Sequence, residues 1–418
     1  MKYAIIGGSA AGIAAAAEIR KLDRKGELTI ICKDKLYYSR CQLHMVASGT
    51  ASVEQICLKP SGWAEDLDIK FMGGKTVYGL DTAAKTVSLD DEQTVHYDRL
   101  LIATGTKTFF PPLEGISGPL TFGLRNLADA AAINEAGKTA KNFTIIGAGL
   151  VGVELAAELV KAGVNVNLVE LAKYPLPLQL DQFCGNKCSK MLADAGVKLY
   201  FGTPARVLHR SRNDAKPVAL ELASGERIAT DVLICAAGVT ANADFARRAG
   251  IDAGKGIIID DQCRTNVPDV FAAGDVAEHV DTVNGIRQLT AVWPTAVRQG
   301  KVAGINMAGG AASIKINTGM KTAMSVMGTH FISLGQTGVS KPQWSRHIFS
   351  NTDSRGRESI RVLYTDGSAL KSALLWGNVT DAGLYHEAIV TGRDISGDYL
   401  FLEGLDAAKR GKETMSVF

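Results

Sequence analysis

Two short glycine-rich stretches of the sequence have the spacing of a turn that binds phosphate groups. The first reads Gly7-Gly8-Ser9-Ala10-Ala11-Gly12, and the second reads Gly147-Ala148-Gly149-Leu150-Val151-Gly152. Each fits the pattern G-x-G-x-x-G, with a serine at the middle glycine of the first, and small residues there let the backbone approach a pyrophosphate. Amides at the start of the following helix would bind the phosphate oxygens. The sequence therefore predicts two dinucleotide sites.

An acidic residue follows the second turn at the distance expected of a ribose ligand. Glu170 ends the next β-branched run, where a carboxylate accepts from both ribose hydroxyls and repels a 2′-phosphate. We therefore expect this site to prefer NAD(H) over NADP(H). After the first turn, Cys32 and Lys33 occupy the corresponding place, and Asp34 is the candidate substitute.

Each turn lies between elements that could position it. A short β-branched run precedes it, an Ala-rich helical stretch follows, and a second β-branched run comes next, in residues 2–34 and again in residues 141–171. This is the pattern of a βαβ unit with buried parallel strands. From about residue 313, strand signals alternate with turn pairs such as Asp366-Gly367. We predict an α/β chain with two Rossmann-like domains and a C-terminal α+β domain that ends in a polar tail.

Two further motifs, Ile102-Ala103-Thr104-Gly105 and Phe271-Ala272-Ala273-Gly274-Asp275, each end a predicted strand. Together with the two glycine turns, in this order, they resemble the FAD-dependent pyridine nucleotide-disulfide oxidoreductase superfamily. The resemblance implies a glutathione-reductase-like fold, in which the first turn binds FAD and the second binds NAD(H). It also implies that Asp275 binds the flavin ribityl chain, and that Gly238 lies in the strand-end turn near the domain junction.

The resemblance sets the expected domain boundaries. Residues 1–108 and 243–312 would form a discontinuous FAD-binding domain, because the NAD(H)-binding domain is inserted into it as residues 109–242. Residues 313–418 would form the C-terminal interface domain.

Within the superfamily, the segment Tyr38-Ser39-Arg40, Leu43 and the segment from Trp293 to Lys301 resemble the NADH:rubredoxin reductase and nitrite reductase flavin-domain branch. This resemblance implies that Arg40 supports FAD and that Trp293, Pro294 and Gln299 lie in a segment beside the flavin ring. Glu154, on the helix after the second turn, is a candidate for contacting the nicotinamide. The alternative for Glu154 is a helix glutamate that faces solvent.

The seven cysteines leave open how electrons would leave the flavin. Neither a redox pair nor a C-x-x-C motif is present, and Cys184 and Cys188 share a helix face without completing a metal site. The position of Cys41 resembles the single redox cysteine of the coenzyme A-disulfide reductase and NADH oxidase/peroxidase branches. Its flanking residues Gln42 and His44 depart from those branches.

The whole-chain properties narrow the class of protein. The 418 residues carry 46 basic and 43 acidic side chains, a net charge of +3, which argues against nucleic-acid binding. No window is apolar enough for a membrane span or a signal peptide, and the odd number of cysteines fits reduced thiols, so we expect a cytoplasmic protein.

We predict an enzyme that moves electrons between NAD(H) and a protein redox partner through FAD. The partner would be a rubredoxin-like iron protein or the iron–sulfur subunit of a larger redox complex, and the chain itself could be a subunit of that complex or a homo-oligomer. The alternative is a thiol flavoenzyme that reduces a small disulfide, a polysulfide, oxygen or peroxide through Cys41. No metal site is expected in the chain.

Overall fold

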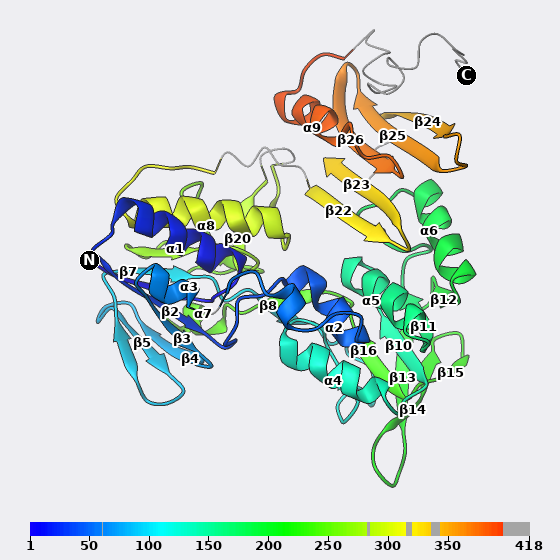
Figure 1. Cartoon of the computed structure of the whole chain (residues 1–418), viewed down its shortest axis with the longest axis horizontal. Helices are drawn as coiled ribbons and strands as arrows, with labels where there is room; N and C mark the ends of the chain where they lie inside the picture. Colours follow the sequence, from blue (N-terminus) through cyan, green and yellow to red (C-terminus); the bar gives the residue numbers. More distant parts are fainter. Residues whose placement is uncertain (61, 282–284, 315–319, 336–342, 396–418) are drawn as a thin grey trace.

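The computed structural model describes residues 1–60, 62–281, 285–314, 320–335 and 343–395. Its main elements form two parallel sheets flanked by helices and one antiparallel sheet with a helix (Figure 1). The predicted α/β class is confirmed. Among the described residues, every helix is too short or too polar to cross a membrane.

The first parallel sheet carries the first glycine turn. Its order is β19-β7-β1-β2-β3, and helix α1 (Ala10–Leu22) connects β1 to β2. Helix α8 (Trp293–Met307) lies alongside α1 (Figure 1). The two helices are so close that a Cβ on Gly300 would lie 2.1 Å from the carbonyl oxygen of Ala11. The strands are β1 (Lys2–Ile6), β2 (Glu27–Cys32), β3 (Ile69–Gly73), β7 (Arg99–Ile102) and β19 (Val270–Ala272).

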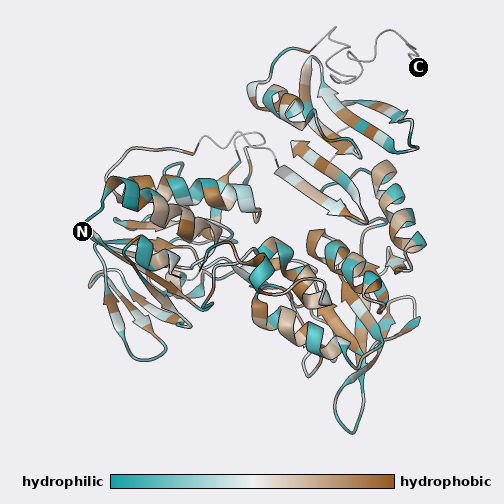
Figure 2. Cartoon of the chain, in the orientation of Figure 1, coloured by the Kyte–Doolittle hydropathy of each residue, from teal (hydrophilic) through white to brown (hydrophobic). Residues whose placement is uncertain are grey.

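The second parallel sheet carries the second glycine turn. Its order is β12-β11-β10-β16-β9, and helix α5 (Leu150–Lys161) connects β10 to β11. Figure 2 shows mainly apolar residues along these strands, as expected of a sheet covered on both faces. The other elements of this unit are β9 (Thr121–Phe122), α4 (Leu127–Gly137), β10 (Asn142–Ile146), β11 (Asn165–Glu170), α6 (Gln182–Asp194), β12 (Lys198–Phe201) and β16 (Val232–Cys235).

The third large sheet is antiparallel, in the order β22-β23-β26-β25-β24. It lies beside α5 and α6 (Figure 1). Some of its buried side chains share one apolar core with the second unit, and the others form a separate core with α9. Its elements are β22 (Met320–Val326), β23 (Thr329–Gly335), β24 (Ser345–Thr352), β25 (Glu358–Asp366), β26 (Ala369–Trp376) and α9 (Ala382–Thr391). The predicted tail, within residues 396–418, lies outside the described residues.

Smaller elements complete the described part of the chain. Three-stranded sheets are formed by β4 (Val77–Asp81), β5 (Thr86–Leu89) and β6 (Thr94–His96), by β13 (Ala205–Arg210), β14 (Pro217–Leu222) and β15 (Arg227–Ala229), and by β18 (Ile257–Ile258), β20 (Ala277–Val280) and β21 (Arg287–Leu289). A two-stranded sheet joins β8 (Thr106–Thr108) to β17 (Val239–Ala241). The short helices are η1 (Arg40–Gln42), α2 (Leu43–Ser48), η2 (Glu54–Ile56), α3 (Trp63–Asp66) and α7 (Asp244–Arg248).

Strands from distant parts of the sequence meet in the first sheet. Strand β19 and helix α8 follow the second unit in the chain, yet both pack with β7 and α1 of the first. The first unit is therefore discontinuous in sequence. The residue numbers given above for the domain boundaries remain predictions.

Candidate functional site

The N-termini of α1 and α5 are free to bind an anion. Ser9 caps α1 and Gly149 caps α5, but neither residue makes a side-chain bond to the helix amides. The first turn of each helix also lacks an acidic residue. Because the first amides of a helix have no partner within the helix, each end offers donors and a positive dipole to a phosphate.

The first and last glycines of each turn are required by close backbone contacts. A Cβ on Gly12 would lie 1.9 Å from the carbonyl oxygen of Gly7, and a Cβ on Gly152 would lie 1.9 Å from that of Gly147. In contrast, a Cβ on Gly149 would meet nothing within 4 Å, so the space beside it is open to a ligand. These turns fit the pyrophosphates of two dinucleotides.

The predicted strand-end motifs converge on the first turn. A Cβ on Gly7 would lie 2.1 Å from the carbonyl oxygen of Ala103, and one on Gly274 would lie 3.0 Å from Cβ of Ala11. The Thr104 hydroxyl donates to the carbonyl of Asn242 at 2.9 Å. The next residue, Gly105, has a positive φ. The structure thus brings together three motifs that are separated by up to about 270 residues in the sequence.

Strand register shows what replaces the missing acid of the first unit. Ile6 pairs with Ile31, and Ile146 pairs with Val169, so Cys32 and Glu170 hold equivalent positions. The Glu170 carboxylate accepts from the amide of Ala148 at 2.7 Å, whereas the buried sulfur of Cys32 faces the equivalent Gly8.

Asp34 lies two residues beyond the end of its strand and binds Arg40. Its carboxylate accepts from Nη2 of Arg40 at 2.5 Å, while Nε of Arg40 donates to the Ser9 hydroxyl at 3.3 Å. The guanidinium also stacks over the ring of Tyr38 at 5.2 Å. Arg40 therefore links the first turn to Asp34. The assignment of Asp34 to the ribose remains a prediction.

Arg125 is a residue of the site that the sequence did not indicate. Its Nη2 donates to the Thr106 hydroxyl at 2.6 Å and to the Asp275 carboxylate at 3.0 Å, and its carbonyl oxygen accepts from Arg40. Its Nε is buried without a hydrogen-bond partner. An orphaned donor next to Asp275 fits a polar ligand at this place. Arg125 directly precedes Asn126, which caps helix α4.

The two candidate catalytic residues line one small pocket. Cys41 and Glu154 share it with His44 and Arg125, together with Arg40, Leu43, Leu124 and Val151. Burial raises the pKa of Glu154 to about 7, with the negative charge of Glu158 as a second cause. Burial also lowers the pKa of His44, whose Nδ1 lies 3.6 Å from the Glu154 carboxylate. Glu154 thus lines this pocket with a side chain that is 23% exposed, and its contact with the nicotinamide remains a prediction.

Cys41 is exposed, but its thiolate is disfavoured. Surrounding protein atoms raise the pKa of the thiol by reducing its hydration, and the carboxylates of Glu154 and Asp275 raise it further, while Arg125 opposes them. Cys184 and Cys188 are fully buried in α6. Within the described ranges no cluster of three potential metal ligands is found.

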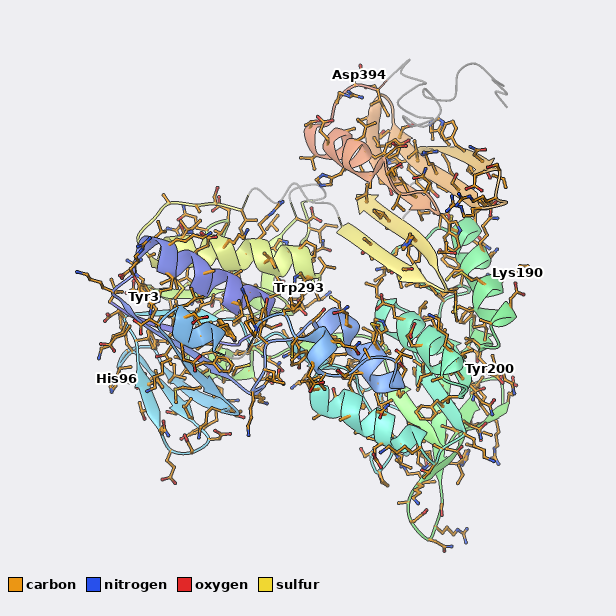
Figure 3. The ribbon with its side chains drawn as sticks, viewed as in Figure 1. Tyr3, His96, Lys190, Tyr200, Trp293 and Asp394 are labelled. Atoms are coloured by element: carbon orange, nitrogen blue, oxygen red, sulfur yellow. The ribbon has the colours of Figure 1, made fainter. Side chains whose placement is uncertain are left out.

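The remaining predicted residues lie around the domain junction. Figure 3 labels Trp293 at the end of α8 that points toward the second unit, where its half-buried side chain packs against the core of the first. Gly238 has a positive φ, and its carbonyl oxygen accepts from the amide of Phe109 at 3.0 Å.

Comparison with known proteins decides the family. The family model described as pyridine nucleotide-disulphide oxidoreductase matches residues 1–300. The chain belongs to this family. The epsilon subunit of the NADH-dependent phenylglyoxylate dehydrogenase of Aromatoleum evansii is 31% identical over 373 residues, which cover 88% of this chain and 86% of the relative. An NADH oxidase of Methanocaldococcus jannaschii is 32% identical over 353 residues, 81% and 76% of the two chains.

A solved structure supports the same assignment over the whole chain. The NADH:rubredoxin oxidoreductase of Clostridium acetobutylicum aligns with a TM-score of 0.77 and 26% identity, covering 98% of this chain and 99% of that one. This member of the pyridine nucleotide-disulphide oxidoreductase family is an NAD(H)-dependent flavoprotein enzyme that uses FAD. The predictions of family, enzyme class and cofactors are confirmed.

Proposed function

We propose that this flavoenzyme moves electrons between NAD(H) and a protein redox partner, either a small iron protein or the iron–sulfur subunit of a larger complex. Bound FAD would exchange a hydride with the nicotinamide at N5 and single electrons with the partner. Two relatives support this class of partner by name, since one acts on rubredoxin and the other is a subunit of a dehydrogenase.

The environment of Cys41 carries the proposal. A redox cysteine reacts as its thiolate and therefore lies in an electropositive setting that lowers its pKa. Burial, together with the carboxylates of Glu154 and Asp275, instead raises the pKa of Cys41 against the opposing charge of Arg125. A thiol held in the protonated form is a poor relay, so electrons would leave the flavin without passing through it.

The residues of the chain then have distinct roles. The turn at Gly147 and the carboxylate of Glu170 would hold the pyrophosphate and ribose of NAD(H). The turn at Gly7, together with Arg40 and Asp275, would hold FAD. Glu154 would lie against the nicotinamide, where its charge state affects the positive charge that develops on the ring as hydride leaves.

The test is a Cys41→Ser variant assayed with NADH and a one-electron acceptor, either rubredoxin or a dye. We expect turnover to stay within a few-fold of the wild type, because the hydroxyl replaces a thiol that does not transfer electrons. A loss of about a hundredfold, near 2.7 kcal/mol on the barrier, would contradict the proposal. A Cys57→Ser variant, which changes a half-buried thiol away from the pocket, is the matched control.

The thiol-enzyme alternative has one observation in its favour. Cys41 lies in the same pocket as Glu154 and His44, so an acid–base pair is within reach of the sulfur. If the thiol-enzyme hypothesis is right, a sulfenic-acid reagent will label Cys41 after peroxide treatment. The variant Cys41→Ser will then also abolish NADH-dependent reduction of peroxide or disulfide. Absence of label with retained one-electron transfer would exclude it.

A further inference from the structure

A buried glutamine lies behind the turn that carries Asp275. Gln299, on helix α8, is 1% exposed, and its side-chain oxygen accepts from the amide of Gly274 at 2.7 Å. Its side-chain nitrogen lies 3.1 Å from Nδ1 of His279, a residue of strand β20 that is 4% exposed. The three residues form a linear chain of hydrogen bonds from β20 through α8 to the turn.

Donor and acceptor counting fixes the charge state of His279 in this chain. The amide of Gly274 can only donate, so Gln299 must present its oxygen to Gly274 and its NH₂ group to His279. Nδ1 of His279 must then accept, which requires a neutral imidazole with its proton on Nε2. That Nε2 is buried, and within the described part of the chain it has no hydrogen-bond partner.

Protonation of His279 is incompatible with this arrangement. An imidazolium carries hydrogen on both nitrogens, so Nδ1–H would face the NH₂ group of Gln299, donor against donor. Rotating the amide of Gln299 by half a turn would satisfy His279 but would point NH₂ at the amide of Gly274. In either case one buried donor loses its acceptor, at a cost that destabilises the turn.

The surroundings of His279 keep it neutral near pH 7. Burial lowers its pKa, Arg287 on β21 lowers it further, and Asp281 opposes both. Strand β18 presents only Ile257 and Ile258, and across β21 the paired residue is the uncharged Gln288. On the side of α8, the thiol of Cys263 donates to the backbone carbonyl of Gln299 rather than to its amide.

We propose that His279 and Gln299 are positioning residues of the flavin-binding turn, and that protonation of His279 releases the turn and weakens FAD retention in acid. The inference rests on the proposed contact between Asp275 and the flavin. Neutral His279 orients Gln299, Gln299 fixes Gly274, and Gly274 sets the direction of the neighbouring Asp275. This chain of hydrogen bonds affects the affinity for FAD and requires no group outside the protein other than FAD.

The test measures release of FAD from the holoprotein as the pH falls, by the fluorescence of flavin that passes an ultrafilter. For the wild type we expect the dissociation constant to rise about tenfold or more between roughly pH 7.5 and pH 5. His279→Asn keeps an acceptor near the position of Nδ1 but cannot titrate. In this variant the rise of the dissociation constant in acid, called the acid step below, should disappear. His209→Asn, which changes a half-exposed histidine on β13, should keep the wild-type step.

Gln299→Glu gives the sharpest outcome, because a carboxylate accepts from both Gly274 and a protonated His279. In this variant FAD retention at low pH should exceed that of the wild type by about tenfold, since protonation now completes the chain of bonds. The proposal is overturned if the step persists in His279→Asn or if Gln299→Glu releases FAD like the wild type. Circular dichroism at each pH shows whether the fold is intact.

The variant Asp275→Asn tests separately whether Asp275 binds the flavin ribityl chain, on which this inference rests. That variant should bind FAD more weakly at every pH. If it retains FAD fully, the ribityl assignment is wrong; if it loses FAD while the acid step survives in His279→Asn, the hydrogen-bond chain alone is wrong.

Discussion

At the residue scale, the pocket combines a carboxyl group whose pKa is raised with an imidazole whose pKa is lowered. Glu154 has a pKa raised to about 7 by burial, and His44 beside it has a lowered pKa for the same reason. Near pH 7, Glu154 therefore changes charge while His44 stays uncharged. A carboxyl that titrates at the working pH is a common feature of catalytic sites.

Hydride transfer from NADH to the flavin should accelerate as the pH rises through about 7, since the carboxylate of Glu154 stabilises the positive charge that develops on the nicotinamide. Stopped-flow bleaching of the flavin by NADH measures this rate. Glu154→Gln should remove the ionisation and stay near the low-pH rate. Glu158→Gln should keep it but move its midpoint to lower pH, because a like charge is lost. An unchanged profile in Glu154→Gln would rule out this role.

Nucleotide preference should depend on Glu170. Its carboxylate is held by the amides of Ala148 at 2.7 Å and Ala172 at 3.0 Å, which fixes a negative charge at the end of β11. Glu170→Gln keeps an acceptor but removes the repulsion of a 2′-phosphate, so we expect the ratio of NADH to NADPH specificity to fall about tenfold. Glu226→Gln, at an exposed turn, should leave the ratio unchanged. Equal rates with both nucleotides in the wild type would contradict the assignment.

At the element scale, α1 is positioned by a helix that the chain supplies almost 300 residues later. Gly300 and Gly304 of α8 face the carbonyl oxygens of Ala11 and Ala15, at 2.1 Å and 2.4 Å from where a Cβ would stand. The two helices can approach this closely because α8 has no side chains at these two positions. The orientation of the α1 N-terminus, and so of the first phosphate site, depends on this contact.

Gly300→Ala should therefore push α8 away from α1, lower the free energy of unfolding by about 1–3 kcal/mol and loosen FAD binding. Denaturant unfolding and flavin release measure the two effects. The control is Gly383→Ala in α9, where a new Cβ would meet nothing within 4 Å. That substitution should stabilise the helix by up to about 1 kcal/mol. A neutral Gly300→Ala variant would show that the helices can separate without cost.

The βαβ units could be predicted from sequence because each rests on local signals, namely a glycine turn between β-branched runs and an Ala-rich helix. The partners of Arg125 could not, since Asp275 lies 150 residues away in the chain and no local pattern links them. The contact of His44 could not be predicted either, for a similar reason. His44 was read only as a departure from a cysteine motif, whereas helix α2 packs it against Glu154 of α5.

At the scale of the whole molecule, Asp181 is one of the polar links between the antiparallel sheet and the second unit, beside the ion pair of Lys187 with Glu358. Asp181 caps helix α6 by accepting from the amide of Cys184 at 2.9 Å, and its carboxylate also binds Arg346 and, at 3.2 Å, the hydroxyl of Tyr364. The apolar core is continuous across this junction. The antiparallel sheet should therefore move together with the second unit, and not as an independent body.

Loss of the ion pair between Arg346 and Asp181 should weaken the docking without unfolding α6. In Arg346→Met, Asp181 keeps its bonds to Cys184 and Tyr364, and Arg346 is 38% exposed, so the expected cost is about 1 kcal/mol or less. Hydrogen exchange should increase at the contact between α6 and β24, while the core strands of both sheets stay protected. Arg357→Met breaks a local pair within the turn after β24 and should leave exchange in α6 unchanged. Equal exchange in α6 for the two variants would mean that the Arg346–Asp181 pair adds nothing to the docking, and that the shared apolar core and the Lys187–Glu358 pair hold the third sheet without it.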